Sequence, residues 1–113
     1  MTQQTWKLNS VKEWFDTIEQ GTKTMEGRLM MHGMQVGDQI DFVCGEQHVF
    51  KQVVSITDYS CFAEMLDVEG IAKILPGITD MLEAVNIFKA WYPTSLQKKT
   101  KVIAIGLGSE KKK

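Results

Sequence analysis

The chain has 113 residues, of which 43% are hydrophobic and 24% charged, with 13 basic residues against 14 acidic ones. This length and composition fit one compact domain and exclude a disordered chain. The net charge of −1 excludes a protein that coats nucleic acid by bulk electrostatics, so a nucleic-acid contact would need a local basic cleft.

Other features narrow the class further. Cys44 and Cys61 are too few for a disulfide scaffold. No apolar run nears the roughly 20 residues that cross a bilayer, and residues 1–8 lack the apolar region of a signal peptide. We therefore expect a cytoplasmic protein without a membrane partner. It would form a single domain over 1–113, with a core at about 6–107 and a flexible polar tail at 108–113.

The first predicted element is a helix over about 11–20. Ser10 and Glu13 have the spacing of a capping box, and Gly21 is placed as a C-cap. Between these signals the apolar residues recur at helical spacing. They are Val11, Trp14, Phe15 and Ile18. This stripe predicts that Trp14 is buried.

A strand follows over 23–30. Its alternation directs Met25 and Leu29 to one face and places Thr24, Glu26 and Arg28 on the other. After a loop over 32–38, the pattern predicts strands over 40–44 and 49–57, joined by a hairpin loop.

Helical spacing then returns in the second half of the chain. Ser60 can cap a short helix that ends near Gly70, and Thr79 can cap a longer one that stops near Tyr92. The run 102–107 is apolar on both faces, as in a buried central strand. We see no repeat and no linker, so the fold class is α+β.

The strand over 23–30 carries the residues that suggest chemistry. Arg28 is the only arginine in the chain, and Glu26 on the same face can orient its guanidinium toward a phosphate or a base edge. Lys23 is expected to add a mobile point charge. Aromatic side chains could stack on an unpaired base. They are Tyr59, Phe62, Trp91 and Tyr92.

Structural explanations compete with each of these. A Lys/Glu/Arg face is often only the solvated side of a strand, and aromatic residues at helical spacing are typically core. A Cys44-x-x-x-His48 pair could chelate a metal, but no second pair has zinc-like spacing. We therefore expect no metal and no cofactor.

The order of the segments resembles a known family. The residues that carry the resemblance are Gly21, Lys23, Glu26 and Arg28 in a G-x-K-x-x-E-x-R pattern, then Val36-Gly37-Asp38, Tyr59-x-x-Phe62, Leu75-Pro76-Gly77, Tyr92-Pro93 and Val102–Ile105. On these motifs, which cover roughly residues 6–107, the chain resembles a stand-alone ASCH domain of the PUA-like superfamily. The resemblance implies a PUA-like small mixed β-barrel with flanking helices and a cleft beside the strand of the motif.

The resemblance also implies a ligand. PUA-like domains commonly bind RNA, so we expect RNA or a modified nucleoside. Its binding residues would be Lys23, Thr24, Glu26, Arg28 and Tyr92.

Some small members of the family resemble amidohydrolases that strip an acyl group from a modified cytidine. In those, a lysine matching Lys23 activates a threonine two residues before the arginine. Here that position is Glu26, which removes the nucleophile. The alternative function is a small hydrolase, an amidohydrolase or a ribonuclease, with Lys23 and Glu26 as its catalytic acid/base groups. A protein-interaction adaptor is the third possibility, and the sequence leaves the oligomeric state open.

Overall fold

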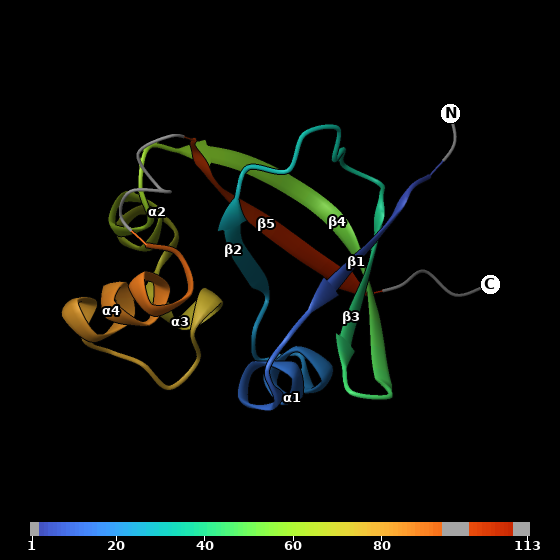
Figure 1. The fold of residues 1–113 in the computed structure, drawn as a ribbon, viewed down its shortest axis with the longest axis horizontal. Coiled ribbons are helices and arrows are strands. Elements are labelled where there is room, and N and C mark those ends of the chain that lie inside the picture. Colours follow the sequence, from blue (N-terminus) through green and yellow to red (C-terminus); the bar gives the residue numbers. More distant parts are fainter. Residues whose placement is uncertain (1–2, 94–99, 110–113) are drawn as a thin grey trace.

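The computed structural model describes residues 3–93 and 100–109, so the tail expected at the C-terminus falls, over 110–113, outside the described residues. It confirms the α+β class with five strands and four helices (Figure 1). In chain order they are β1 (Thr5–Asn9), α1 (Lys12–Gln20), β2 (Met25–Leu29), β3 (Gln39–Cys44), β4 (Gln47–Tyr59), α2 (Phe62–Glu69), α3 (Ile71–Ile74), α4 (Met81–Trp91) and β5 (Val102–Ser109).

The strands form one curled sheet in the order β1-β3-β4-β5-β2. Only the pairing of β1 with β3 is parallel, and the other three pairings are antiparallel. The expected mixed barrel is thus confirmed as a half-barrel, whose open sides are the edge strands β1 and β2 (Figure 1). The central position predicted for β5 is confirmed, since it lies between β4 and β2.

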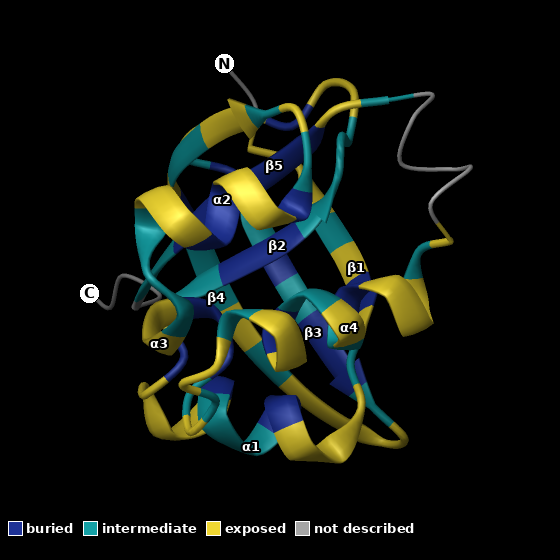
Figure 2. Cartoon of the chain, turned by 90° about the vertical axis from the view of Figure 1, so that its left-hand side faces the viewer, coloured by how far each residue is buried: buried dark blue, intermediate teal, exposed yellow. Residues whose placement is uncertain are grey.

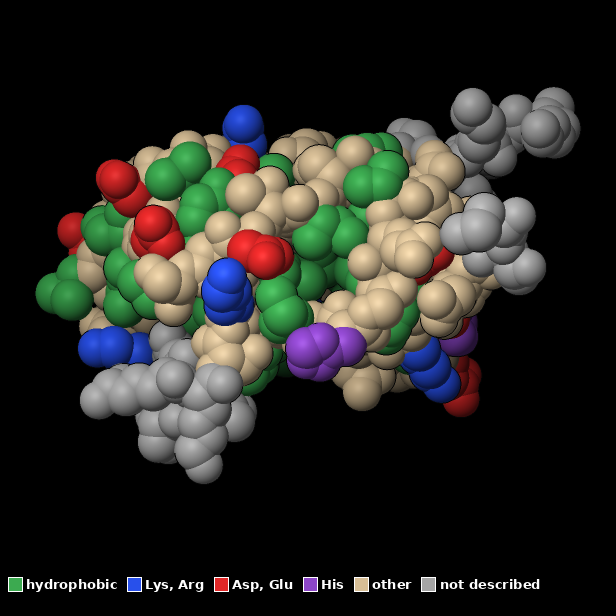
Figure 3. Space-filling view, turned by 90° about the horizontal axis from the view of Figure 1, so that it is seen from above, with side chains coloured by type: hydrophobic (Ala, Val, Ile, Leu, Met, Phe, Trp, Pro, Cys, Tyr) green, Lys and Arg blue, Asp and Glu red, His purple; other side chains and the backbone are tan. Residues whose placement is uncertain are grey.

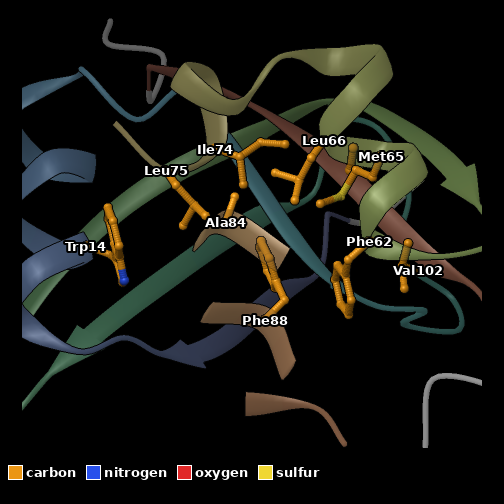
Figure 4. Close-up of a cluster of buried hydrophobic side chains, with 10 residues drawn as sticks. Trp14, Phe62, Met65, Leu66, Ile74, Leu75, Ala84, Phe88 and Val102 are labelled. Atoms are coloured by element: carbon orange, nitrogen blue, oxygen red, sulfur yellow. The ribbon is translucent and has the colours of Figure 1, made fainter. Parts of the chain in front are cut away.

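Two apolar cores pack against opposite faces of β5. Val102 and Ala104 contact the cluster formed with α2, α3 and α4, and Ile103 and Ile105 contact the cluster formed with α1 and the other strands. Successive strand residues point to opposite faces, which explains why this segment is apolar throughout. Figure 2 shows the helices with buried inner faces and exposed outer faces. Trp14 belongs to the first cluster and is buried, as predicted (Figure 4).

The predicted helix caps need correction. Helix α1 starts from Val11 without a side-chain cap; the Ser10 hydroxyl donates to the Val11 carbonyl at 3.4 Å instead of accepting an N–H of the first turn. Helix α4 is capped by Asp80, one residue after the predicted Thr79; its carboxylate accepts the Glu83 N–H at 2.9 Å. Ser60 does not cap α2 but donates its hydroxyl to a carboxylate of that helix.

Candidate functional site

The motif strand enters the site directly from the end of α1. Gly21 adopts the left-handed conformation with φ of 88°, which a residue without a Cβ reaches at little cost. The N–H groups of Gly21, Thr22 and Lys23 all donate to the Thr17 carbonyl, which fixes the path of the turn. This turn delivers Lys23 to the start of β2 with its side chain directed inward.

Lys23 is 4% exposed, so the expectation of a mobile point charge is wrong. Its Nζ donates to the Met25 carbonyl at 2.9 Å and to the carbonyl of Ile74, the last residue of α3. It also lies 3.4 Å from Glu26 Oε1. Burial lowers the pKa of Lys23, and the Glu26 carboxylate opposes that shift. Lys23 therefore ties β2 to α3 and holds one oxygen of Glu26.

Glu26 is 9% exposed and is shared by two cations. Oε1 faces Lys23, and Oε2 accepts from Arg28 Nε at 2.6 Å. The Glu26–Arg28 pairing predicted from their common strand face is confirmed. A buried carboxylate held at both oxygens has a fixed orientation, and so does the guanidinium bonded to it.

Arg28 bridges the open sides of the half-barrel. Its Nη2 donates at 2.9 Å to the carbonyl of Asn9, the last residue of β1, while its own backbone lies in β2. Burial alone would lower the pKa of the Arg28 guanidinium, but Glu26 and the Tyr92 hydroxyl raise it above its ordinary value. Glu26 and Asn9 each take one of its five N–H groups and the Tyr92 hydroxyl also bonds the side chain, so the guanidinium keeps donor capacity.

The gap between β2 and the chain that leaves β1, which we call the seam, contains a cavity of about 170 Å³. Lys23, Glu26 and Arg28 supply its charged side, with two cations against one anion. Its apolar walls are aromatic and come from α1 and from the end of α4. They are Trp14, Phe88, Trp91 and Tyr92. A small cavity that combines aromatic walls with a few oriented polar groups is typical of a ligand site.

Gly27 forms part of the cavity wall between Glu26 and Arg28. A Cβ placed on it would lie 2.6 Å from Met65 Cε and 3.2 Å from Phe88 Cζ. Glycine therefore lets β2 pack this closely on α2 and α4 without a shift of Met65 or Phe88, and this close packing brings the aromatic end of α4 up to the charged groups.

Four of the five predicted ligand-binding residues line this cavity: Lys23, Glu26, Arg28 and Tyr92. Thr24 does not; it is exposed, and its backbone N–H bonds the Lys73 carbonyl. Of the predicted stacking residues, Trp91 and Tyr92 reach the cavity. Phe62 is buried in the core, and the Tyr59 hydroxyl donates to Glu69, so neither lines it.

Sequence reasoning missed the cavity wall formed by Trp14 and by residues 9–11. The helical stripe assigned Trp14 to the core, where it does pack, but the same ring also lines the cavity. Its indole N–H has no hydrogen-bond partner among the described residues, although no buried side-chain nitrogen or oxygen there is unsatisfied. This nitrogen is therefore open to solvent; Figure 4 shows it on the side of the ring away from Leu75.

On the face in Figure 3, the Lys and Arg side chains of the described residues are scattered among acidic ones. Within residues 3–93 and 100–109, no three His, Cys, Asp or Glu side chains are grouped as metal ligands would be. No helix in the described part of the chain is long and apolar enough to cross a membrane.

Comparison with known proteins adds family and structural matches. The family model of the ASCH domain matches residues 8–110. The chain is similar to the crystal structure of hypothetical protein PH0355, with 34% identity, a TM-score of 0.85, and coverage of 92% of this chain and 97% of that one. It is also similar to the solution structure of protein PF0455 from Pyrococcus furiosus, with 30% identity, a TM-score of 0.75, and coverage of 92% and 96%.

A more distant match concerns the fold alone. The crystal structure of ASCH from Zymomonas mobilis shares 13% identity at a TM-score of 0.66, and the match covers 92% of this chain and 66% of that one. A search of curated proteins found no significant match.

Proposed function

Because the chain belongs to the ASCH domain family, we propose that it binds RNA or a modified nucleoside and holds one base in the cavity beside β2. The observation that carries the proposal is the guanidinium of Arg28, fixed by Glu26 at 2.6 Å on the wall of an aromatic-lined cavity. A planar, oriented donor suits a base edge or a phosphate oxygen, and aromatic rings suit the face of an unpaired base.

The size of the cavity and the charge of the chain limit what can bind. A volume of about 170 Å³ is below the 300 Å³ or more that is usual for drug-sized ligands, so it fits one ring system. With a net charge of −1, we expect only two or three phosphate contacts. On single-stranded RNA the slope of log K against log salt should then be about −1.5 to −2. A slope near −6 would contradict a local site.

The hydrolase alternative has one observation in its favour, the lowered pKa of Lys23 beside a carboxylate. Against it, Lys23 Nζ already faces three acceptors, from Met25, Ile74 and Glu26. A general base needs a free lone pair within reach of its substrate. We therefore propose binding without turnover, and incubation with acetylated nucleosides and with RNA should leave both unchanged.

The test of the binding site is Arg28→Lys. Lysine keeps the charge but loses the planar fork, so binding of a short single-stranded RNA should weaken by about 1–3 kcal/mol, the value of one good bidentate contact. Quenching of the tryptophan fluorescence gives the affinity, since Trp14 and Trp91 line the cavity.

The matched control is Lys12→Ala, which removes a cation from the exposed side of α1, where Lys12 pairs with Asp16. It should bind RNA like the parent protein. If Arg28→Lys also binds like the parent, the cavity is not the binding site. A protein that binds neither RNA nor any nucleoside would instead favour the adaptor function.

A further inference from the structure

Strand β2 has one paired side and one open side. As an edge strand it pairs with β5 alone among the described strands, in an antiparallel register that joins Met25 to Gly106 and Leu29 to Val102. In such a ladder, alternate residues exchange both backbone hydrogen bonds with the partner, and the residues between them direct their N–H and C=O to the other side.

The hydrogen bonds at the two ends of the ladder fix which residues are which. The Leu107 N–H donates to the Thr24 carbonyl, and the Met30 N–H donates to the Lys101 carbonyl. Even-numbered residues of β2 therefore bond β5, whereas Met25, Gly27 and Leu29 present their backbone groups to the open edge.

At this open edge, the Met25 carbonyl accepts from Lys23 Nζ at 2.9 Å. The N–H and C=O of Gly27 have no partner among the described residues, and Gly27 lines the cavity. The cavity wall thus carries one backbone donor and one backbone acceptor side by side, between the side chains of Glu26 and Arg28. Unpaired backbone groups in a partly enclosed site are rare and favour a bound partner.

We propose that the main chain of Gly27 reads the edge of the bound base, its N–H donating to a ring or carbonyl acceptor and its C=O accepting the adjacent N–H. This inference rests on the proposed function and adds to it the backbone groups that contact the base, which must present a donor next to an acceptor. Guanine, uracil, cytosine and adenine all do so on their pairing edges.

A peptide added as an extra strand is the other ligand that uses an open strand edge. It needs several successive free backbone groups. Here the Met25 carbonyl is taken by Lys23, and the Arg28 side chain crosses the seam to Asn9, so these two side chains interrupt the edge on either side of Gly27. The donor–acceptor pair on Gly27 by itself fits a heterocycle and is too short for a strand.

The experiment follows the backbone amide of Gly27 in ¹⁵N-labelled full-length protein, with each of the four ribonucleosides as the probe. The nucleoside that binds should move the Gly27 amide proton downfield and slow its exchange at least about tenfold. Gly45, in the turn between β3 and β4, is the control glycine and should not respond.

The second measurement compares each nucleoside with a counterpart methylated at the edge donor. The pairs are uridine with 3-methyluridine, guanosine with 1-methylguanosine, and cytidine and adenosine with their N-dimethylated forms. Because methylation leaves the Gly27 carbonyl without its donor, the counterpart of the binding nucleoside should bind roughly 10- to 100-fold more weakly.

The possible failures are distinguishable. If a nucleoside binds and Arg28→Lys weakens it, yet Gly27 is unaffected and the methylated counterpart binds equally, this inference is overturned and the proposed function stands. If no nucleoside and no RNA binds, the proposed function fails as well. If the peptide acetyl-Thr-Val-Thr-Val-amide shifts Gly27 and no nucleoside does, the open edge takes a strand and base reading is overturned.

Discussion

Two carboxylates are buried among the described residues, and their surroundings differ. Asp38, in the turn before β3, is 5% exposed and accepts only from neutral donors: Trp6 Nε1 at 2.9 Å and the backbone N–H groups of Gln35 and Gln4. Glu26 is 9% exposed and is held by two cations on the wall of a cavity. Asp38 has all its partners within the fold, whereas the partners of Glu26 face a space that a ligand can enter.

The contrast separates a structural acid from a candidate functional one. Asp38 joins β1 to the turn before β3, and nothing in its surroundings requires a ligand. Glu26 orients the Arg28 side chain, which retains N–H donors. The glycine between them, Gly27, allows β2 to pack closely on α2 and α4 at the cavity wall. Burial alone would not have distinguished the two residues; the charge and accessibility of their partners do.

The largest effect should come from Glu26→Ala. The change leaves Lys23 buried without an anionic partner, and breaking a buried pair on one side typically lowers the free energy of unfolding by about 3–5 kcal/mol. Urea unfolding measures it. Adding Lys23→Met to the variant removes the uncompensated charge and should restore part of the loss. A double variant no more stable than Glu26→Ala would show that the pairing with Lys23 contributes nothing.

Asp38→Ala should be less severe. It leaves three neutral donors without their acceptor and should lower the free energy of unfolding by about 2–3 kcal/mol, as lost buried hydrogen bonds do. Because the effect centres on β1, amide exchange of Thr5–Asn9 should accelerate, while RNA binding of the folded fraction stays at the parent value. Weakened RNA binding would contradict a purely structural role.

Asp38→Asn should have a smaller effect, because asparagine keeps the shape of the Asp38 side chain and removes only its charge. Burial alone would raise the pKa of Asp38, but hydrogen bonds from Trp6, Gln35 and Gln4 bring it below its ordinary value of 3.8. A lowered pKa in the folded state adds stability above pH 3.8, which is lost as the pH falls through the folded pKa. The melting temperature of Asp38→Asn should therefore approach that of the parent protein below pH 3.8. A constant difference across that range would contradict the shift.

The smallest effect should be that of Lys12→Ala. Lys12 lies 3.1 Å from Asp16, but its side chain is 69% exposed. Exposed ion pairs contribute little because water screens them. Urea unfolding should not separate the variant from the parent protein. A clear loss of stability would mean that the exposed Lys12–Asp16 pair contributes more than its exposure predicts, and that exposure does not distinguish it from the buried Lys23–Glu26 pair.

Much of the fold could be predicted from the sequence, because its signals are local. The apolar stripe with Gly21 located α1, and alternation located β2 and the common face of Glu26 and Arg28. Strand β1 was missed. It has five residues with one buried, Leu8, and it pairs in parallel with β3, whose register places Gln39 opposite Thr5. Parallel strands that pair lie far apart in sequence, so no local sequence pattern indicates the pairing.

The sequence predicted which charged residues form the candidate site, but not how they are buried or which groups they contact. A motif supplied Lys23, Glu26 and Arg28, and all three line one cavity. The burial of Lys23 could not be inferred, since one of its acceptors is the carbonyl of Ile74 in another helix. The second role of Trp14 could not be inferred either. Its helical spacing indicates a core residue, but its place in the cavity wall depends on where β1 and β2 separate.

The open seam also bears on self-association. An unpaired strand edge is a template for pairing with another copy of the chain, and so an aggregation hazard. Both edges of this sheet meet at the seam, where Lys23 occupies the carbonyl of Met25 and Arg28 occupies that of Asn9. The two cations that build the cavity thus also act as gatekeepers that deny a foreign strand its backbone partners. Replacing either one should make the protein more prone to aggregate at high concentration, independently of any loss in binding.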